Sequence, residues 1–571
     1  MDAFNPIITG ITCIFFMSLV AIISYYKTKG EVGTPDGYFL ASRGLNGIFI
    51  AGSLLLTNLS AEHLIGLNGS AYGYNLSSMA WEVTAAISTI CMAYIFLPRY
   101  LAGAFTTIPE FLCSRFDEDV RRLLVILFMF GYGLVTIPSV LYSGSIAVLM
   151  LFDLPSILNL SYSQSLAITI VLIGSIGAVY AIFGGLKAVA VSDTLNGIGL
   201  LIIGMLVPIL GLIMLGEGSF VEGLIIITTT KTEKLNAIGS SSDPTPFGTL
   251  FTGMIFANLF YWCTNQYVIQ RTLGSKSLAE GQKGVLFSGF YKVLVPFMMM
   301  IPGVIAYHLY GDGLSSIDVA YPRLIRDVLP RYAGGFFLAV LLGAVFSSFN
   351  SLLNSAATLF CMDVYLPLKK GNVNDKKLLI IAKRASVVIA LFSFVIAPLL
   401  QFAPDGLWQI IRIFTGFYNI PVIAVVIVGL FTTRVPSIGP KIAIVFHIIF
   451  YGLFQFVFKD ILQIHFLHLY AILFISEVLI MLIIGHIRPL SKPWVFNKKK
   501  VIDLTPWKKA FPVSVTLFTA VIVLYILFSP IGLVGGLTAK FWPIIILLTT
   551  INIIIWLYNT QGNNKLSVLG N

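Results

Sequence analysis

Three charged residues lie inside long apolar stretches of this chain: Glu82, Lys292 in FYKVLVPF and Arg412 in WQIIRIFTG. A charged side chain in hydrocarbon costs at least about 2.5 kcal/mol, so such residues are usually paired and usually mark a substrate or ion path. Glu82 accepts hydrogen bonds, Lys292 donates them, and Asn258 and Gln409, also in apolar stretches, do both. The set predicts a binding site for a ligand rich in hydroxyls. A structural ion pair is the alternative interpretation.

Aromatic residues accompany these polar groups. Trp81 precedes Glu82, and Tyr261 follows Asn258 by three positions. A sugar ring combines hydroxyls with an apolar face that can stack on an aromatic ring, so the combination favours a sugar-like ligand. His63, in TNLSAEH, fits either a ligand contact or a satisfied core histidine.

The elements that must position these residues are membrane helices. The chain has 571 residues, 57% hydrophobic and 11% charged, with mean hydropathy +0.92, whereas soluble proteins carry about 25% charged residues. An all-α polytopic membrane protein is therefore expected. The apolar runs long enough to span lie at 7–26, 47–71, 78–98, 122–150, 163–183, 188–215, 247–270, 284–309, 334–361, 379–402, 406–431, 441–458, 467–486, 510–529 and 541–559.

The charge distribution predicts the orientation of these runs. With the N-terminus outside, the cytoplasmic segments and their flanks hold 27 Lys and Arg, and the outer segments hold seven. Because positive charge accumulates on the cytoplasmic side, this predicts an outer N-terminus and, after fifteen runs, a cytoplasmic C-terminus. The formal net charge of +11 is then a topology signal and not a nucleic-acid footprint.

Two of the runs are interrupted by polar residues. TNLSAEH (57–63) breaks the second run and NLFYWCTNQ (258–266) breaks the seventh. The two runs lie five spans apart, and since five is odd, a five-helix unit repeated once has inverted orientation. Paired breaks of this kind point to the central site of a transporter. Polar contacts between helices are the alternative, and the second break, which lacks Gly and Pro, could remain helical.

The sequence resembles the sodium/solute symporter family, most closely its sugar branch of sodium/galactose and sodium/glucose cotransporters. The stretches that carry the resemblance are DGYFLASRGL (36–45), SLLLTNLSAEHLIGLNGSAYG (53–73), TTIPEFLCSRF (106–116), VYAIFGGLKAVAVSDTLNG (179–197), ANLFYWCTNQYVIQRTLGSKSLAEGQKG (257–284) and FSSFNSLLNSAATLFCMDVY (346–365). The resemblance implies a leucine-transporter-type core of five plus five helices in inverted repeat, with alternating access driven by sodium.

The resemblance also implies site residues. Na+ would be bound by the carbonyls of Leu56, Leu59 and Ala344 and the hydroxyls of Ser347 and Ser348, with Asp193 on the sodium route. The solute site would comprise His63, Glu82, Asn258, Lys292, Gln409 and Arg412, with Tyr261 as the inner gate.

Four positions depart from the sugar pattern, namely His63, Ala85, Thr136 and Arg412, where the pattern has Gln, Ser, Asn and Gln. A second buried cation could balance a carboxylate, sulfate or phosphate on the ligand, because Arg binds such groups through two parallel hydrogen bonds. Glu82 would repel a carboxylate brought close to it, which favours a neutral sugar.

The expected organisation is an N-terminal helix and loop, a first repeat, an extracytoplasmic loop, a second repeat and a group of peripheral helices, with bounds 1–46, 47–215, 216–246, 247–431 and 432–571. Sodium-driven uptake of a sugar across a bacterial inner membrane is the leading hypothesis. The alternatives are symport of an acidic sugar or another small solute, proton coupling, and a membrane sensor on a transporter fold. No nucleophile-elbow, P-loop or metal-ligand motif favours an enzyme.

Overall fold

The computed structural model describes residues 6–28, 34–152, 154–370, 373–402, 407–462 and 464–568, and its named elements are all helices. Thirteen of these helices are long and apolar enough to cross a membrane, and a bent pair raises the number to fourteen in the described chain. These spans coincide with fourteen of the fifteen apolar runs. The remaining run, 247–270, folds as a short 3-10 helix followed by two shorter α-helices.

The first part of the chain begins with α1, which is followed by the short helices α2 and η1. The elements of this part are α1 (Pro6–Thr28), α2 (Pro35–Leu40), η1 (Ala41–Arg43), α3 (Gly47–Asn58), α4 (Ala61–Gly73), η2 (Leu76–Met79), α5 (Ala80–Val83), α6 (Ala85–Cys91), η3 (Met92–Phe96), α7 (Leu97–Gly103), α8 (Ile108–Arg115), α9 (Glu118–Phe130), η4 (Gly131–Thr136), α10 (Ile137–Phe152), α11 (Leu154–Leu158) and α12 (Tyr162–Leu215). The long α12 contains the fifth and sixth apolar runs.

The connecting loop and second repeat follow. They comprise α13 (Phe220–Thr229), η5 (Thr232–Leu235), η6 (Phe247–Phe251), α14 (Gly253–Cys263), α15 (Gln266–Leu273), α16 (Leu278–Val295), η7 (Pro296–Met300), α17 (Ile301–Tyr310), η8 (Ile317–Val319), α18 (Ala320–Val328), η9 (Arg331–Ala333), α19 (Gly334–Leu359), η10 (Phe360–Tyr365), α20 (Leu366–Leu368), α21 (Asp375–Ile396), η11 (Ala397–Phe402) and α22 (Leu407–Phe431).

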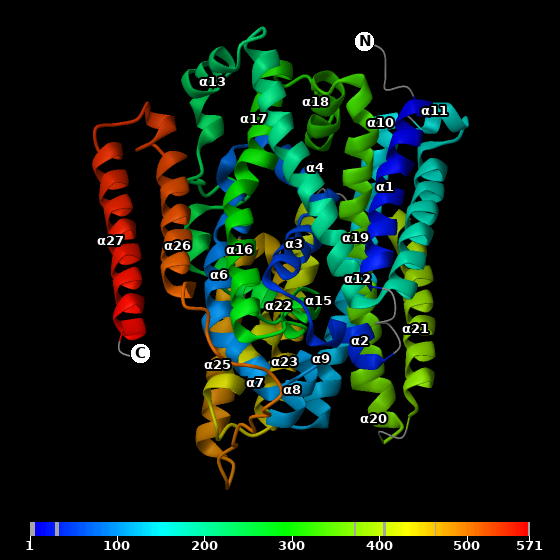
Figure 1. Cartoon of the computed structure of the whole chain (residues 1–571), viewed down its shortest axis with the longest axis vertical. Helices are drawn as coiled ribbons and strands as arrows, with labels where there is room; N and C mark the ends of the chain where they lie inside the picture. The colour runs from blue at the N-terminus through cyan, green and yellow to red at the C-terminus, as the bar shows by residue number, and fades with distance from the viewer. Residues whose placement is uncertain are drawn as a thin grey trace.

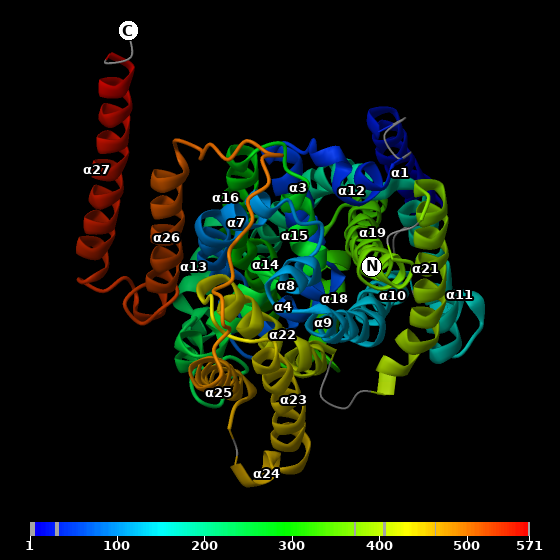
Figure 2. The ribbon, with the colours of Figure 1, turned by 90° about the horizontal axis from the view of Figure 1, so that it is seen from below.

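The C-terminal helices lie around this core. They are α23 (Ile438–Gly452), η12 (Leu453–Val457), α24 (Lys459–Leu462), α25 (Phe466–Ile487), α26 (Ala510–Leu527), η13 (Leu533–Gly535) and α27 (Phe541–Val568). Figure 2 shows α26 and α27 on one side of the molecule, with α27 the outermost helix. Only 6% of the apolar window of α27 is buried, so most of its surface is left for lipid.

Polar caps fix where several of these helices begin. Asn46 caps α3, Asp117 caps α9 and Ser277 caps α16, each by accepting a hydrogen bond from a backbone N–H in the first turn. Ser161 and Gln164 form a reciprocal capping box at the start of α12. Such caps satisfy N–H groups that an apolar helix start leaves without partners.

The loops alternate between the two ends of the helix bundle. Figure 1 shows α11, α13, α18 and the α26–α27 connection at the upper end, and α2, α8, α20 and the segment between α25 and α26 at the lower end. This grouping agrees with the alternation inferred from the Lys and Arg counts. Which end faces the cytoplasm, like the proposed domain bounds, stays a prediction.

The first polar interruption is a true break. α3 and α4 meet at an angle of 59°. The backbone leaves the helical conformation at Leu59, and the Ser60 N–H bonds the Asn58 carbonyl at 3.1 Å instead of the Leu56 carbonyl four residues back. The carbonyl of Leu56 is thereby released from the helical ladder, as helix breaks at transporter sites require.

The second interruption is also a break, although it lacks Gly and Pro. α14 ends at Cys263, Thr264 and Asn265 are non-helical, and α15 begins at Gln266. The interpretation that this stretch could stay helical is therefore wrong. The broken helices lie at the centre of the bundle, since α3 packs against α12, α16 and α19 and α14 packs against α6, α22 and α25.

Candidate functional site

A small enclosed cavity lies between the two breaks. Its free volume is about 30 Å³, which is room for about two water molecules. The residues that line it are Asn58, His63, Trp81, Glu82, Ala257, Asn258, Tyr261, Trp262, Arg412 and Asn419. Five of the seven predicted solute-site residues are among them.

The sixth, Lys292, forms an ion pair with Glu82 next to the cavity. Lys292 Nζ donates to Glu82 Oε2, and both side chains are almost fully buried. Glu82 comes from the short α5, in the predicted first repeat, and Lys292 from α16, in the predicted second repeat. The ion pair therefore joins the two repeats, and the Lys292 ammonium also lies 5.3 Å from the centre of the Trp262 ring.

His63 contacts the other oxygen of the same carboxylate. Its Nε2 lies 3.4 Å from Glu82 Oε1, while its Nδ1 lies 3.3 Å from Ser60 Oγ and 3.6 Å from Glu62 Oε1. His63 sits in the first turn of α4, directly after the break. The structure thus places it in the predicted site and not in the apolar core.

Arg412 stacks on an aromatic ring at the cavity wall. Its guanidinium carbon is 4.6 Å from the centre of the Trp81 ring, within the range of a cation–π contact. Trp81 in turn stacks on Phe466 with an interplanar angle of 12°. Arg412 therefore contacts an aromatic ring, whereas the ion-pair partner of Glu82 is Lys292.

Asn258 and Tyr261 face the cavity from α14. Asn258 Nδ2 donates to Thr84 Oγ1 at 2.8 Å, and the Tyr261 hydroxyl accepts from the Tyr267 hydroxyl at 2.7 Å. Tyr267 belongs to α15, so this hydroxyl pair spans the second break. A ring in this position can cover a ligand on one side, as an inner gate would.

The remaining predicted solute residue, Gln409, lies in α22 one turn before Arg412, and its side chain is outside the described residues. Five further residues line the cavity that were not selected as site residues: Asn58, Trp81, Ala257, Trp262 and Asn419. Asn58 and Asn419 could have been found from the sequence, because each is a polar residue within an apolar run. Their Oδ1 atoms are buried and have no hydrogen-bond partner among the described residues.

Asn265 and Gln266 hold the second break in place. Asn265 Oδ1 accepts from the Tyr132 hydroxyl at 2.6 Å. Gln266 Oε1 accepts from the Ile108 N–H at 3.1 Å, and its Nε2 donates to the Thr106 carbonyl at 3.2 Å. The side chains of Asn265 and Gln266 therefore stabilise the non-helical backbone between α14 and α15.

One of the predicted sodium ligands, Ser348, contacts the first break. Ser348, on α19, approaches the end of α3, where its Oγ lies 3.1 Å from the Thr57 carbonyl and 3.5 Å from the released Leu56 carbonyl. Leu59 and Ala344 are fully buried nearby in the chain. In transporters of this type, Na+ is coordinated by neutral oxygens beside unwound helix backbone. Thr57 was not among the predicted ligands.

Ser347 and Asp193 adjoin this group. The Ser347 Oγ is buried without a hydrogen-bond partner among the described residues. Asp193 Oδ2 accepts from Ser53 Oγ at 2.6 Å and pairs with Arg271 Nη2 at 3.5 Å. Asp193 is thus already paired in this conformation.

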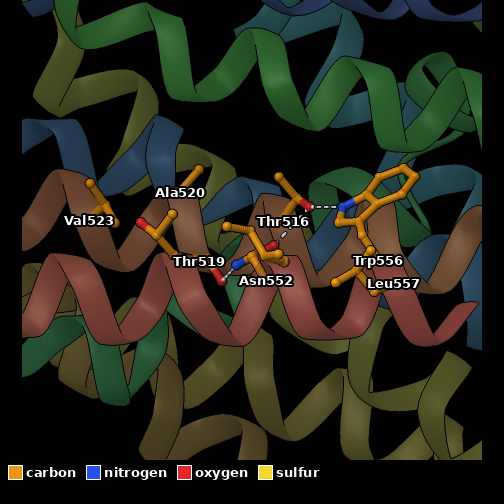
Figure 3. Close-up of a pocket in the computed structure, with 9 residues that line it drawn as sticks. Thr516, Thr519, Ala520, Val523, Asn552, Trp556 and Leu557 are labelled. Atoms are coloured by element: carbon orange, nitrogen blue, oxygen red, sulfur yellow. Dashed lines mark hydrogen bonds between the residues drawn. The ribbon is translucent and has the colours of Figure 1, made fainter.

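A larger pocket of about 530 Å³ lies away from these charges, between α26 and α27. Figure 3 shows its polar side chains turned toward one another: Asn552 lies between Thr516 and Thr519, and the Trp556 indole N–H donates to Thr516. These contacts join the two helices. The described residues hold no group of three or more His, Cys, Asp or Glu that could bind a metal ion.

Comparison with known proteins places the chain among membrane transporters. The profile described as "Sodium:solute symporter family" matches residues 38–445. The chain is 44% identical over 523 residues to an uncharacterized symporter, YidK, of Escherichia coli K12, covering 91% of this chain and 90% of that protein. It is 32% identical to a sodium/glucose cotransporter of Vibrio parahaemolyticus over 73% of this chain and 79% of that protein.

A human sodium/myo-inositol cotransporter 2 is 30% identical, with 77% of this chain and 69% of that protein covered. Among solved structures, a Na+-coupled sialic acid symporter in a substrate-bound outward-open state matches with a TM-score of 0.74. Its sequence identity is 21%, and the match covers 85% of this chain and 99% of that one. This structural match confirms the predicted fold class.

Proposed function

Because this chain belongs to the sodium:solute symporter family, we propose that it takes up a neutral sugar or polyol together with Na+. The single observation that carries the choice of solute is the Glu82–Lys292 ion pair beside a cavity with walls of Trp81, Tyr261 and Trp262. A carboxylate and an ammonium group in fixed geometry can accept from and donate to neighbouring ring hydroxyls. Relatives named for glucose and myo-inositol support a polyhydroxylated ligand.

The two unpartnered amide oxygens on the cavity wall fit this ligand class. Asn58 Oδ1 and Asn419 Oδ1 are buried acceptors, and a buried acceptor without a donor costs about 1–3 kcal/mol. Hydroxyls of a bound sugar would supply the missing donors. An anionic ligand would also meet Lys292 and Arg412, but it would approach Glu82 at a repulsive distance.

Sodium is proposed to bind at the first break, held by the carbonyls of Leu56, Leu59 and Ala344 and the hydroxyls of Ser347 and Ser348. The approach of Ser348 to the end of α3 supports this assignment. The helix break also links the two sites, because His63, which contacts Glu82, lies only a few residues after Leu59. Binding of Na+ at the break would therefore fix the start of α4 and with it the solute site.

Transport requires the cavity to change size. Sites for small organic ligands measure about 300–1,000 Å³, whereas this cavity offers about 30 Å³. The helices around it must therefore move apart before a sugar enters, as alternating access demands. We place the protein in a bacterial inner membrane, with its N-terminus outside and its C-terminus in the cytoplasm.

The test is uptake of radiolabelled D-galactose, D-glucose or myo-inositol into proteoliposomes with an inward sodium gradient, a proton gradient or neither. Uptake that needs sodium and is competed by a neutral sugar supports the proposal. Uptake driven by protons alone would overturn the assignment of the coupling ion. Uptake of a uronic or sialic acid but of no neutral sugar would overturn the assignment of the solute.

A further inference from the structure

His447 and Glu477 form a second buried pair of titratable groups, outside the solute cavity and the sodium site. His447 lies on α23 and Glu477 on α25, and both side chains are fully buried. The His447 Nδ1 lies 2.5 Å from Glu477 Oε1, and its Nε2 lies 3.0 Å from the carbonyl oxygen of Gly416 on α22. The imidazole ring stacks on Tyr451.

Hydrogen-bond chemistry fixes how many protons this pair carries. A carbonyl oxygen only accepts, so Nε2 must carry the hydrogen that faces Gly416. A neutral imidazole has one N–H, which leaves a lone pair on Nδ1, and a lone pair cannot face a carboxylate at 2.5 Å. A proton must therefore lie between Nδ1 and Oε1. Because Glu477 Oε2 has no hydrogen-bond partner among the described residues, the neutral carboxylic acid is favoured over a buried carboxylate.

The neighbours of this pair hold the same part of α22. The Tyr470 hydroxyl donates to the Arg412 carbonyl at 2.5 Å, and the Tyr451 hydroxyl donates to the Ile413 carbonyl at 2.7 Å. A Cβ atom at Gly416 would come within 2.5 Å of the Tyr451 hydroxyl oxygen, so only glycine allows this close approach. Side chains of the peripheral helices thus bond three carbonyls within about one turn of α22.

That turn begins with Arg412, whose guanidinium stacks on Trp81 in the solute cavity. We infer that His447 and Glu477 are positioning residues: they share one trapped proton and, through the Gly416 carbonyl, fix the turn of α22 that presents Arg412 to the solute. The link to transport rests on the proposed function. The shared proton and the fixed turn rest instead on the contacts of His447 with Glu477 and Gly416.

Glu477→Gln provides a matched test, because a glutamine amide can donate to Nδ1 as the protonated carboxyl does but carries no acidic proton. Glu477→Leu removes the donor at similar volume. Infrared difference spectra of the purified full chain at neutral pH, unmodified minus Glu477→Gln, should show the C=O stretch of a protonated carboxylic acid. A carboxylate signal in its place, or no difference, would overturn the assignment of the proton.

Hydrogen exchange of peptides covering 411–422 tests the fixed turn, with peptides from α1 as the internal reference. Exchange should be about tenfold faster in Glu477→Leu, as expected for the loss of a buried hydrogen bond, and unchanged in Glu477→Gln. Equal exchange in all three proteins, or equal acceleration in both variants, would overturn the positioning role.

Sodium-driven galactose uptake adds the functional readout. Glu477→Leu should raise the KM for galactose without lowering the maximal rate per folded transporter, because an Arg412 side chain that is no longer held against Trp81 would intrude on the cavity, and Glu477→Gln should leave the KM unchanged. In an Arg412→Gln background, Glu477→Leu should add nothing, since its effect passes through Arg412. A further rise of KM in that background would overturn this route. Absence of any sodium-driven uptake in the unmodified chain would reject the proposed function, while the infrared and exchange results still decide the pair.

Discussion

The two proposed sites sit on either side of the same helix break and use opposite chemistry. The solute cavity is built around charges, with Glu82 held between Lys292 and His63. The group proposed to bind Na+ at the end of α3 consists of neutral oxygens, and the neighbouring carboxylate of Asp193 is paired with Arg271. Removing one member of a buried ion pair leaves a charge without its partner, whereas removing one of several neutral ligands only weakens a site.

This difference teaches which changes test function and which test stability. A charged site couples solute binding to folding, because its members stabilise one another across the two repeats. A neutral site can lose an oxygen and still fold.

The largest effect is expected from Lys292→Met, which leaves the Glu82 carboxylate buried without its ammonium partner. The cost is about 3–5 kcal/mol of folding free energy, so the melting temperature should fall and galactose uptake should cease. Thermal unfolding in detergent and proteoliposome uptake measure the two effects.

The control for this prediction is the double variant Glu82→Gln with Lys292→Met, which removes both charges at similar volume. It should recover much of the stability but no uptake. Uptake at the unmodified rate in the double variant would show that the ion pair is structural and that the solute binds elsewhere.

Ser347→Ala with Ser348→Ala should raise the sodium concentration for half-maximal uptake while leaving the fold intact. Each lost oxygen is worth about 1 kcal/mol, which corresponds to roughly a tenfold or greater rise for the pair. Ser386→Ala is the matched control, because Ser386 is buried on α21 and, among the described residues, its hydroxyl donates to the carbonyl of Ala382 in its own helix. Unchanged sodium dependence in the double variant would reject the assigned site.

Tyr261→Ala should weaken retention of the solute, because it removes a ring worth about 0.5–1.5 kcal/mol beyond its buried area. Tyr261→Phe keeps the ring and loses the hydroxyl that accepts from the Tyr267 hydroxyl, so its affinity should lie closer to that of the unmodified protein than the affinity of the alanine variant. Equilibrium binding of labelled galactose measures both. If the alanine variant binds as tightly as the parent, Tyr261 is a packing residue.

The smallest effect on a neutral sugar is expected from Arg412→Gln, which restores the residue of the sugar-branch pattern. Galactose or glucose uptake should persist or improve, because the Glu82–Lys292 pair is retained. An anionic sugar, by contrast, should lose its uptake in this variant. Competition of labelled galactose by neutral and acidic sugars, before and after the substitution, separates the two ligand classes.

The lengths and spacing of the apolar runs were sufficient to predict most of the membrane spans. Runs near 20 residues predicted the spans because a helix of that length crosses the hydrocarbon core, and the odd spacing of the two polar interruptions predicted inverted repeats. The nature of the second break could not be predicted this way. Tyr132, Ile108 and Thr106 bond the side chains of Asn265 and Gln266 at this break, and these partners are distant in the chain.

For the site, the sequence by itself determined which residues had to be explained. Glu82, Lys292 and Arg412 are costly in a membrane wherever the helices place them, so composition alone marks them. Only the tertiary structure decided which side chains pair: Lys292 forms an ion pair with Glu82, and Arg412 stacks on Trp81. The same holds for His447 and Glu477, which come into contact only because α23 and α25 pack against each other and against α22. Pairing depends on distances between helices that are far apart in the chain, and no local pattern encodes such distances.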